Sequence, residues 1–488
     1  MKRAITISAA LVAFLGLASA PAALAVSGPP HIPEGTTGSL TVHKFEQPTL
    51  YGPDNQGMEL PEDQIADLVP FPGVTFTVRQ VTGVDLTVHT GWQIAQQVVD
   101  NFDPFTPEGI VGGELGWGEE RSEITGSDGV ATFTDLPVGL YLVEETGVPP
   151  VASNSAVTGS MPFLITVPLT HPLDTDRWVF DVHVYPKNVL STVTKTVIDS
   201  DMVAVGETME YPITASIPGG SVTTAYSITD QLDPRLSYES STVTIGGKAT
   251  TDITAVEDDG LVTVTLGHSA REAAFAAVQA DANAVVEVRH TVTVNATGEI
   301  PNDATLIFQR EGEWETEVPS TPVVSKIGGI TVLKHNRDKA PLAGATFEVH
   351  ASHTNDFASA TAVTVEGISS WTTGADGKVA IDGLRYSAWA NGASVNEESG
   401  KYNFYWLVET KAPAGYELLP QPIPFVVDAQ IEVADVIEVV NTPHNAGGTL
   451  PLTGAQGSAA LMVLGLVLVG AGGSVFTAVR RSAKRGSY

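Results

Sequence analysis

The sequence predicts an all-β fold of three tandem β-sandwich domains, and this expectation rests on pattern, punctuation and length. β-branched and aromatic residues alternate with polar ones in short runs, for example at 39–43, 74–78, 242–245 and 262–266. Glycine, proline, asparagine and aspartate separate the runs, which is typical of β-sandwiches with Greek-key connections. A chain of 488 residues supports about three domains of ordinary size.

An internal repeat relates the two ends of the chain. We therefore expect related outer domains at 30–188 and 326–445, and a different middle domain at 189–325. Two helical patterns, at 92–99 and 270–282, are expected as inserts on this β scaffold. The repeated segments pair 38–44 with 329–334, 71–78 with 342–349, 127–130 with 375–378, and 141–146 with 405–410.

The N-terminus has the pattern of a secretory signal peptide. Lys2 and Arg3 precede an apolar stretch, and the small residues Ala23 and Ala25 offer a cleavage site. Residues 1–25 are therefore expected to be removed on export and are excluded from the fold.

The last forty residues combine a short motif, an apolar run and a basic end. Residues 457–479 carry no charge and are long enough for a transmembrane helix. The basic tail at 480–488 would hold the C-terminus inside the cell. The motif that precedes them consists of Leu450, Pro451, Leu452, Thr453 and Gly454.

This order resembles the LPXTG cell-wall sorting signal of Gram-positive surface proteins. The resemblance implies that a sortase transpeptidase cuts between Thr453 and Gly454. The sortase cysteine would hold the Thr453 carbonyl as a thioester, and an amine would then resolve it. An ordinary single-pass membrane anchor is the alternative reading of the same residues.

Composition argues against several other functions. Removing both processed ends takes away six of the 25 Lys and Arg residues and none of the 56 Asp and Glu residues, so the net charge falls from −31 to −37. Such a surface repels nucleic acid. There is no cysteine, and the eleven histidines show no metal-binding spacing. We expect no cofactor, no metal site and no enzymatic activity; a surface hydrolase is a distant alternative that an activity screen would test.

One lysine follows a strand-like segment at the end of the first domain. Val182 and Val184 alternate inward, and Pro186 ends strand pairing, so Lys187 is expected at a domain edge with its amine accessible. Residues 178–187 resemble the pilin motif of Gram-positive shaft pilins. The resemblance implies that Lys187 attacks the thioester and joins to Thr453 of another subunit. A solvated lysine at a strand end is the plainer alternative.

The last domain contains a lysine, an acid and an asparagine in a recognisable order. Residues 405–416 resemble the pilin E-box, and the domain resembles the immunoglobulin-like domains of the collagen-adhesin B type. The resemblance implies an intramolecular isopeptide bond between Lys334 and Asn441, with Glu409 as the acid. Burial lowers the pKa of a lysine amine so that it can attack, and a buried protonated acid polarises the amide. A buried Lys334–Glu409 ion pair capped by Asn441 is the alternative.

The middle domain resembles the collagen-adhesin pattern in which aspartate is the acid. The resemblance assigns Lys195, Asp230 and Asn302 to a second isopeptide triad. Asp230 could equally form a turn and Asn302 could be a loop residue.

The first domain offers a third triad. Lys44, Glu145 and Asn188 occupy the equivalent places, and Glu144 is the alternative acid. The rest of the E-box is degraded at 148–150, and in related pilins this domain is often unbonded before assembly. Whether this bond forms stays open at the level of sequence.

These features together predict the major structural subunit of a covalent, adhesion-supporting surface fimbria on a Gram-positive bacterium. Its expected partners are further copies of itself, a pilin-specific sortase, tip or base pilins, and peptidoglycan reached through a housekeeping sortase. The alternative is a monomeric wall-anchored adhesin that uses the sorting signal once. Lys187 distinguishes the two, because only a polymer needs it.

Overall fold

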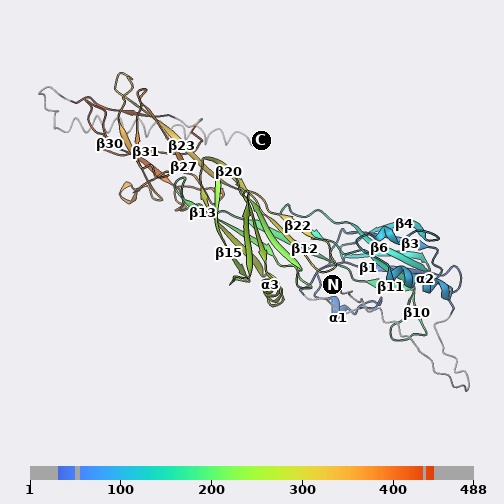
Figure 1. Ribbon diagram of the computed structural model, residues 1–488. Helices are drawn as coiled ribbons and strands as arrows, with labels where there is room; N and C mark the ends of the chain where they lie inside the picture. The colour runs from blue at the N-terminus through green and yellow to red at the C-terminus, as the bar shows by residue number, and fades with distance from the viewer. Residues whose placement is uncertain (1–30, 50–54, 432–435, 445–488) are drawn as a thin grey trace, which may run out of the picture.

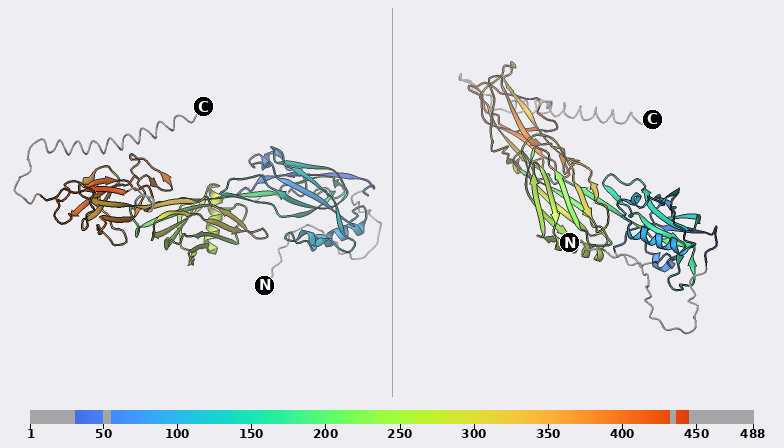
Figure 2. Two further views of the ribbon diagram at one scale, coloured as in Figure 1. Left: turned by 90° about the horizontal axis from the view of Figure 1, so that it is seen from above. Right: turned by 45° about the vertical axis from the view of Figure 1, so that its right-hand side comes forward.

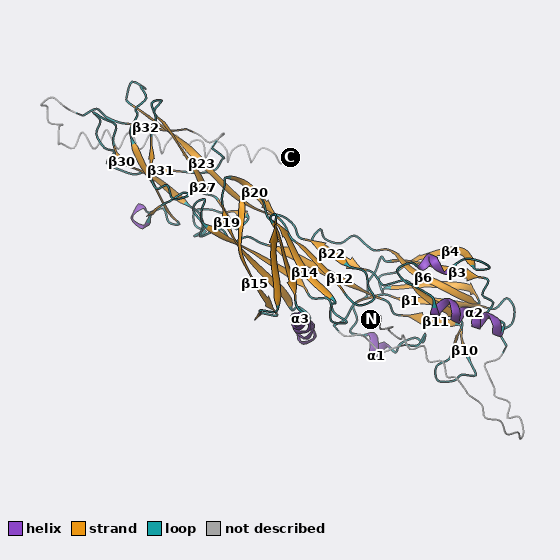
Figure 3. Ribbon diagram, in the orientation of Figure 1, coloured by secondary structure: helices purple, strands orange, loops and turns teal. Residues whose placement is uncertain are grey.

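The computed structural model describes residues 31–49, 55–431 and 436–444, which form three β-rich regions that follow one another along an elongated molecule (Figures 1 and 2). The expected signal peptide, sorting motif, transmembrane segment and basic tail lie outside the described residues. Among the described residues, no helix is both long and apolar enough to cross a membrane. Strands dominate all three regions and the helices are short (Figure 3).

The N-terminal sandwich packs a three-stranded sheet, in the order β11-β1-β5, against a four-stranded sheet, in the order β4-β3-β6-β8. Alternation creates this core, because every second residue of a strand faces the same side. Leu40 and Val42 of one sheet and Phe76 of the other are completely buried. The strands are β1 Thr37–His43, β3 Thr75–Thr82, β4 Gly116–Ile124, β5 Val130–Pro137, β6 Gly139–Gly147, β8 Phe163–Val167 and β11 Asp181–Val184.

Shorter elements complete this region. The 92–99 prediction is confirmed as part of α2 His89–Asp100, whose buried residues pack on the end of the sandwich. The remaining elements are β2 Phe45–Glu46, α1 Glu62–Ile65, the 3₁₀ helix η1 Pro107–Ile110, β7 Ser155–Thr158, β9 Leu169–Thr170 and β10 Trp178–Val179.

The middle sandwich packs a seven-stranded sheet, in the order β16-β15-β19-β13-β12-β2 with β7 also on β12, against a five-stranded sheet, in the order β17-β18-β14-β21-β22. The 270–282 prediction is confirmed as α3 His268–Ala280. The strands are β12 Lys187–Lys195, β13 Thr208–Ser216, β14 Ala225–Gln231, β15 Leu236–Ile245, β16 Lys248–Thr250, β17 Ile253–Asp258, β18 Leu261–Leu266, β19 Val285–Val294, β21 Thr305–Gln309 and β22 Thr316–Pro319.

The C-terminal sandwich packs β20-β23-β27, with β32 also on β23, against β25-β24-β30-β31, with β26 on β24. Its buried residues are continuous with those of the middle sandwich. The elements are β20 Gly298–Asn302, β23 Val323–His335, β24 Thr346–Ser352, the 3₁₀ helix η2 Phe357–Ser359, β25 Thr361–Ala362, β26 Trp371–Thr372, β27 Lys378–Arg385, β28 Trp389–Ala390, β29 Ala393–Ser394, β30 Phe404–Lys411, β31 Ile423–Phe425 and β32 Val436–Val440.

Two long strands connect the three sandwiches. Strand β12 pairs with β2 and β7 of the N-terminal region at its start and with β13 of the middle region at its end. Strand β23 pairs first with β20 and then with β27 and β32. The boundaries expected near Asn188 and Ser325 thus fall inside continuous strands rather than in loops, and the exact division into domains stays a prediction.

Candidate functional site

The C-terminal sandwich brings Lys334, Glu409 and Asn441 together in its core. Strand β23 runs parallel to β32 with Lys334 opposite Val439, so the chain delivers Asn441 two residues later beside the lysine. The Lys334 Nζ lies 2.9 Å from Glu409 Oε1 and contacts the side-chain carbonyl oxygen of Asn441. Asn441 Nδ2 donates to Glu409 Oε1 at 3.0 Å. Lys334 and Asn441 are completely buried, and burial lowers the pKa of the Lys334 amine.

A tight turn holds the backbone of this lysine in place. The Lys334 amide donates to the carbonyl of Gly377 at 2.8 Å, and the Lys334 carbonyl accepts from Leu342 at 2.8 Å. Gly377 has φ +74°, and a Cβ on it would lie 2.4 Å from the Lys334 carbonyl oxygen. Glycine is therefore required here both for its conformation and for the close approach.

The N-terminal sandwich assembles its own cluster in the same way. Lys44 Nζ lies 2.8 Å from Glu145 Oε2, and Asn188 Nδ2 donates to Glu145 Oε1 at 2.5 Å. Burial, with a smaller contribution from nearby Lys187, lowers the pKa of the Lys44 amine to about 8 against the attraction of Glu145. The alternative acid Glu144 pairs instead with Arg79, at 2.7 Å.

The turn around this lysine repeats that of the C-terminal sandwich. Lys44 donates to the carbonyl of Gly129 at 2.8 Å and accepts from Phe71 at 2.9 Å. A Cβ on Gly129, which has φ +75°, would lie 2.3 Å from the Lys44 carbonyl oxygen. The internal repeat therefore includes the structural support of the lysine as well as the lysine, acid and asparagine themselves.

The middle sandwich places Lys195 against Asp230 in the core. The two side chains form a completely buried ion pair, and the Lys195 Nζ lies 4.5 Å from the centre of the Tyr211 ring. Burial lowers the pKa of the Lys195 amine to about 8 and raises that of the Asp230 carboxyl. Asp230 lies inside β14 and not in a turn, so the turn-forming alternative is wrong.

Asn302 completes this group less tightly. It ends β20, is almost fully buried, and lies close enough to Asp230 to lower the pKa of that carboxyl, an effect smaller than the raising effect of burial. Neither polar atom of its amide makes a hydrogen bond of ordinary geometry, however. Lys195 Nζ reaches the neighbouring Asp303 carbonyl at 3.2 Å, so the lysine lies beside this end of β20.

Lys187 begins β12, one residue before Asn188. Its Nζ donates to the Tyr185 carbonyl at 3.0 Å, and partial burial lowers the pKa of its amine. The Tyr185 ring stacks on His43 with centroids 4.5 Å apart, and its hydroxyl accepts from the Leu60 amide at 2.8 Å. The candidate nucleophile is therefore positioned by an edge of the N-terminal sandwich and is half-buried there.

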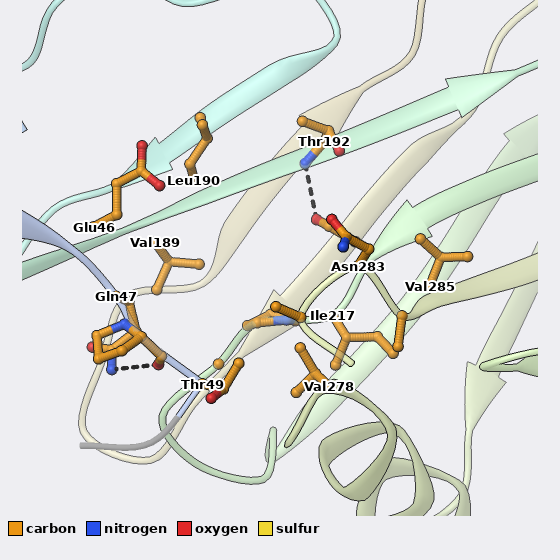
Figure 4. Close-up of a pocket in the computed structure, with 16 residues that line it drawn as sticks. Glu46, Gln47, Thr49, Val189, Leu190, Thr192, Ile217, Val278, Asn283 and Val285 are labelled. Carbon is orange, nitrogen blue, oxygen red and sulfur yellow. Dashed lines mark hydrogen bonds between the residues drawn. The ribbon is translucent and has the colours of Figure 1, made fainter. Parts of the chain in front are cut away.

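A cleft of about 410 Å³ lies further along the same strand, where the N-terminal and middle regions meet (Figure 4). Val189, Ile217 and Val278 supply apolar surface, and Glu46 and Asn283 lie at polar positions of the lining. Because Val189 is only two residues from Lys187, the cleft is adjacent to the candidate linkage site.

Several contributing residues have no counterpart in the sequence-based assignment. Ser160 donates to Glu145 Oε2 through its amide and its hydroxyl, each at 2.9 Å. The Leu419 amide donates to Glu409 Oε2 at 2.8 Å. His290 lies 3.7 Å from Asp230 Oδ2. Of these residues, only His290 is marked in the sequence, because it interrupts a run of inward-facing valines in β19.

Comparison with known proteins agrees with this architecture. Residues 35–189 match the family model for the N-terminal domain D1 of Gram-positive pilin subunits, residues 328–442 match a prealbumin-like fold domain, and residues 442–483 match the LPXTG cell wall anchor motif. The fimbrial subunit type 1 of Actinomyces viscosus is 33% identical over 98% of both chains. The fimbrial subunit type 2 of Actinomyces naeslundii is 31% identical over 92% of this chain and 90% of that one.

A solved structure shows the same arrangement of the chain. The full-length major pilin SpaD of Corynebacterium diphtheriae superimposes with a TM-score of 0.66 at 26% identity, covering 85% of this chain and 98% of the pilin. Identity over nearly the whole length, together with the anchor motif, establishes both family and location. The chain belongs to the Gram-positive fimbrial subunits, and it is a sortase-polymerised shaft pilin of a cell-wall-anchored surface fimbria.

Proposed function

We propose that the bond between subunits joins the Thr453 carbonyl of one copy to the Lys187 amine of the next. A sortase cysteine would take the Thr453 acyl group as Gly454 leaves, and Lys187 would displace the cysteine thiol to form an amide. The observation that carries this proposal is the position of Lys187 at an ordered domain edge, with burial lowering the pKa of its amine. A lower pKa raises the neutral, nucleophilic fraction at neutral pH. The adjacent cleft offers room for an incoming chain.

The partners follow from this chemistry. A pilin-specific sortase would catalyse each addition, tip or base pilins would occupy the ends, and a housekeeping sortase would transfer the last Thr453 to peptidoglycan. The family consists of structural subunits. We propose that this chain likewise has no enzymatic activity beyond forming its own internal bonds.

The test of the linkage compares two lysine substitutions in the fimbriated cell. Lys187→Ala should convert the high-mass ladder on denaturing gels to monomer. Lys248→Ala, which removes an exposed lysine on β16, should leave the ladder unchanged. Tryptic peptides of native fibres should contain Lys187 joined to Thr453. A full ladder from the Lys187→Ala strain would refute the assignment.

We also propose that each sandwich closes an internal isopeptide bond, between Lys44 and Asn188, Lys195 and Asn302, and Lys334 and Asn441. The acid would take a proton from the lysine and polarise the amide carbonyl. The neutral amine would then attack the amide carbon. A second proton would pass from the attacking nitrogen to the departing nitrogen, which leaves as ammonia, while the acid keeps the first proton. What supports the proposal is that each lysine is buried against its acid. Asn188 and Asn441 hydrogen-bond to the acids of the outer sandwiches, and Asn302 is buried near Asp230.

Intact mass tests these three bonds together. The mature ectodomain should weigh less than its sequence by one ammonia, about 17 Da, for each bond formed. Peptide mapping would show which of the three pairs is joined. A mass equal to the sequence value would reject all three bonds and leave three buried ion pairs.

A further inference from the structure

Each of the outer acids has a donor that belongs to neither the lysine nor the asparagine. In the N-terminal sandwich the Ser160 amide donates to Glu145, and in the C-terminal sandwich the Leu419 amide donates to Glu409. Such a donor fixes the orientation of the carboxyl group, so that its other oxygen faces the asparagine. Among the described residues no backbone amide donates to Asp230, and its Oδ1 has no hydrogen-bond partner.

His290 lies where that donor is missing. It is completely buried on β19, and its Nε2 lies 3.7 Å from Asp230 Oδ2 without a hydrogen-bond partner. The groups that face it are Asp230 on β14, Lys195 on β12, Tyr211 opposite it on β13, and Tyr238 and Ser241 on β15. Burial, helped by nearby Lys195, lowers the pKa of the His290 imidazole to about 3, so the ring is neutral at physiological pH.

The other ring nitrogen is already engaged. His290 Nδ1 lies 2.7 Å from the Ser241 hydroxyl, which in turn lies 2.7 Å from the Tyr238 hydroxyl. A neutral imidazole has one N–H donor and one acceptor, and the partner of one nitrogen decides the state of the other. If Tyr238 donates to Ser241 and Ser241 donates to Nδ1, the proton of the ring is on Nε2, directed at Asp230.

We propose that His290 is the positioning residue of the middle isopeptide site, with its Nε2–H serving Asp230 as the backbone amides serve the acids of the outer sandwiches. This inference rests on the proposed bond between Lys195 and Asn302. His290 undergoes no net proton change. Of the two protons that the Lys195 ammonium loses, Asp230 passes one to the departing nitrogen and keeps the other, while the histidine holds the carboxyl toward Asn302.

The experiment compares two substitutions that differ in reach. His290→Gln retains an N–H donor near the Nε2 position, whereas His290→Asn retains one only near Nδ1. The full ectodomain is produced by cell-free translation between pH 5.5 and 8.5, quenched at intervals, and digested. The fraction of the peptide that links Lys195 to Asn302 is then followed by mass spectrometry. The rates at which the other two cross-links form, measured in the same digests, serve as internal controls. A thermal melt checks that each variant folds.

We expect His290→Asn to slow the Lys195–Asn302 bond at least about tenfold and to shift the pH profile of its rate, with both outer bonds unaffected. His290→Gln should stay within about threefold of the parent. Equal rates in parent and His290→Asn would overturn the proposal, and so would equal slowing by both variants, since that would indicate packing alone. Absence of the linked peptide from the parent would refute the middle isopeptide bond itself, and the role of His290 with it.

Discussion

Removing the acid of the C-terminal cluster should lower the melting temperature of its sandwich by about 20 °C. The proposed bond closes a loop of 107 residues between Lys334 and Asn441. A cross-link over about 100 residues removes unfolded-chain entropy equivalent to about 4.7 kcal/mol at 25 °C. For a domain slightly above 100 residues, each kcal/mol corresponds to about 4 °C in Tm. Glu409→Gln preserves the volume of the side chain and leaves the amine and the amide unreacted.

A second variant separates the covalent contribution from the electrostatic one. Lys334→Met also abolishes the bond, but it leaves Glu409 with its Asn441 and Leu419 donors. The loss of stability common to both variants gives the contribution of the cross-link. The additional loss in Glu409→Gln gives the cost of burying the lysine without its acid. Calorimetry of the ectodomain gives the transitions, and hydrogen exchange in β24 and β30 identifies the one that moves. If mass spectrometry shows a bonded parent and two unbonded variants, yet both melt within about 5 °C of the parent, the loop-entropy reasoning is wrong.

Two further predictions concern the support of the lysines and their protonation. Gly377→Ala should destabilise the C-terminal sandwich by about 2 kcal/mol or more and lower the yield of the Lys334–Asn441 bond. Gly344→Ala is the control, because Gly344 has a similar φ of +82° but no atom within 4 Å of its Cβ, and it should cost only about 1 kcal/mol. Equal effects of the two substitutions in denaturant unfolding would contradict the close-approach argument. Asn302→Ala should leave Lys195 unreacted with a pKa of about 8 against the ordinary 10.5. The unfolded chain then binds more protons between those pH values, so the stability of this variant should rise by about 3 kcal/mol from pH 8 to 10.5, and a flat or falling profile would contradict the shift.

The sequence was most informative where the repeat supplied two examples of one design. Lys44 and Lys334 end the equivalent segments 38–44 and 329–334, and Glu145 and Glu409 occupy equivalent positions, so each copy supported the assignment in the other. Alternation along β6 turns Glu145 inward beside Lys44 and leaves Glu144 to pair with Arg79, so the geometry favours Glu145 as the acid.

The remaining parts depend on contacts that local patterns do not encode. The amides of Ser160 and Leu419 act through the backbone, so no side-chain type marks them. Asn302 is held in place by the pairing of β20 with β23, a contact between segments more than twenty residues apart in the sequence. The cleft beside Lys187 exists only because β12 continues from one sandwich into the next.

The positions of the proposed cross-links determine where a protease could sever a fibre. With the proposed bonds in place, a cut within 196–301 or 335–440 leaves the fibre in one piece, because a Lys–Asn link bypasses each segment. The stretch from Asn302 to Lys334 has no such bypass, and its turn at 311–315 is largely exposed. Arg310 clamps this turn by pairing with Glu313 at 2.6 Å. A cut in this turn would therefore break the polymer, as would a cut within 188–195 or 441–453, which also lack a bypass.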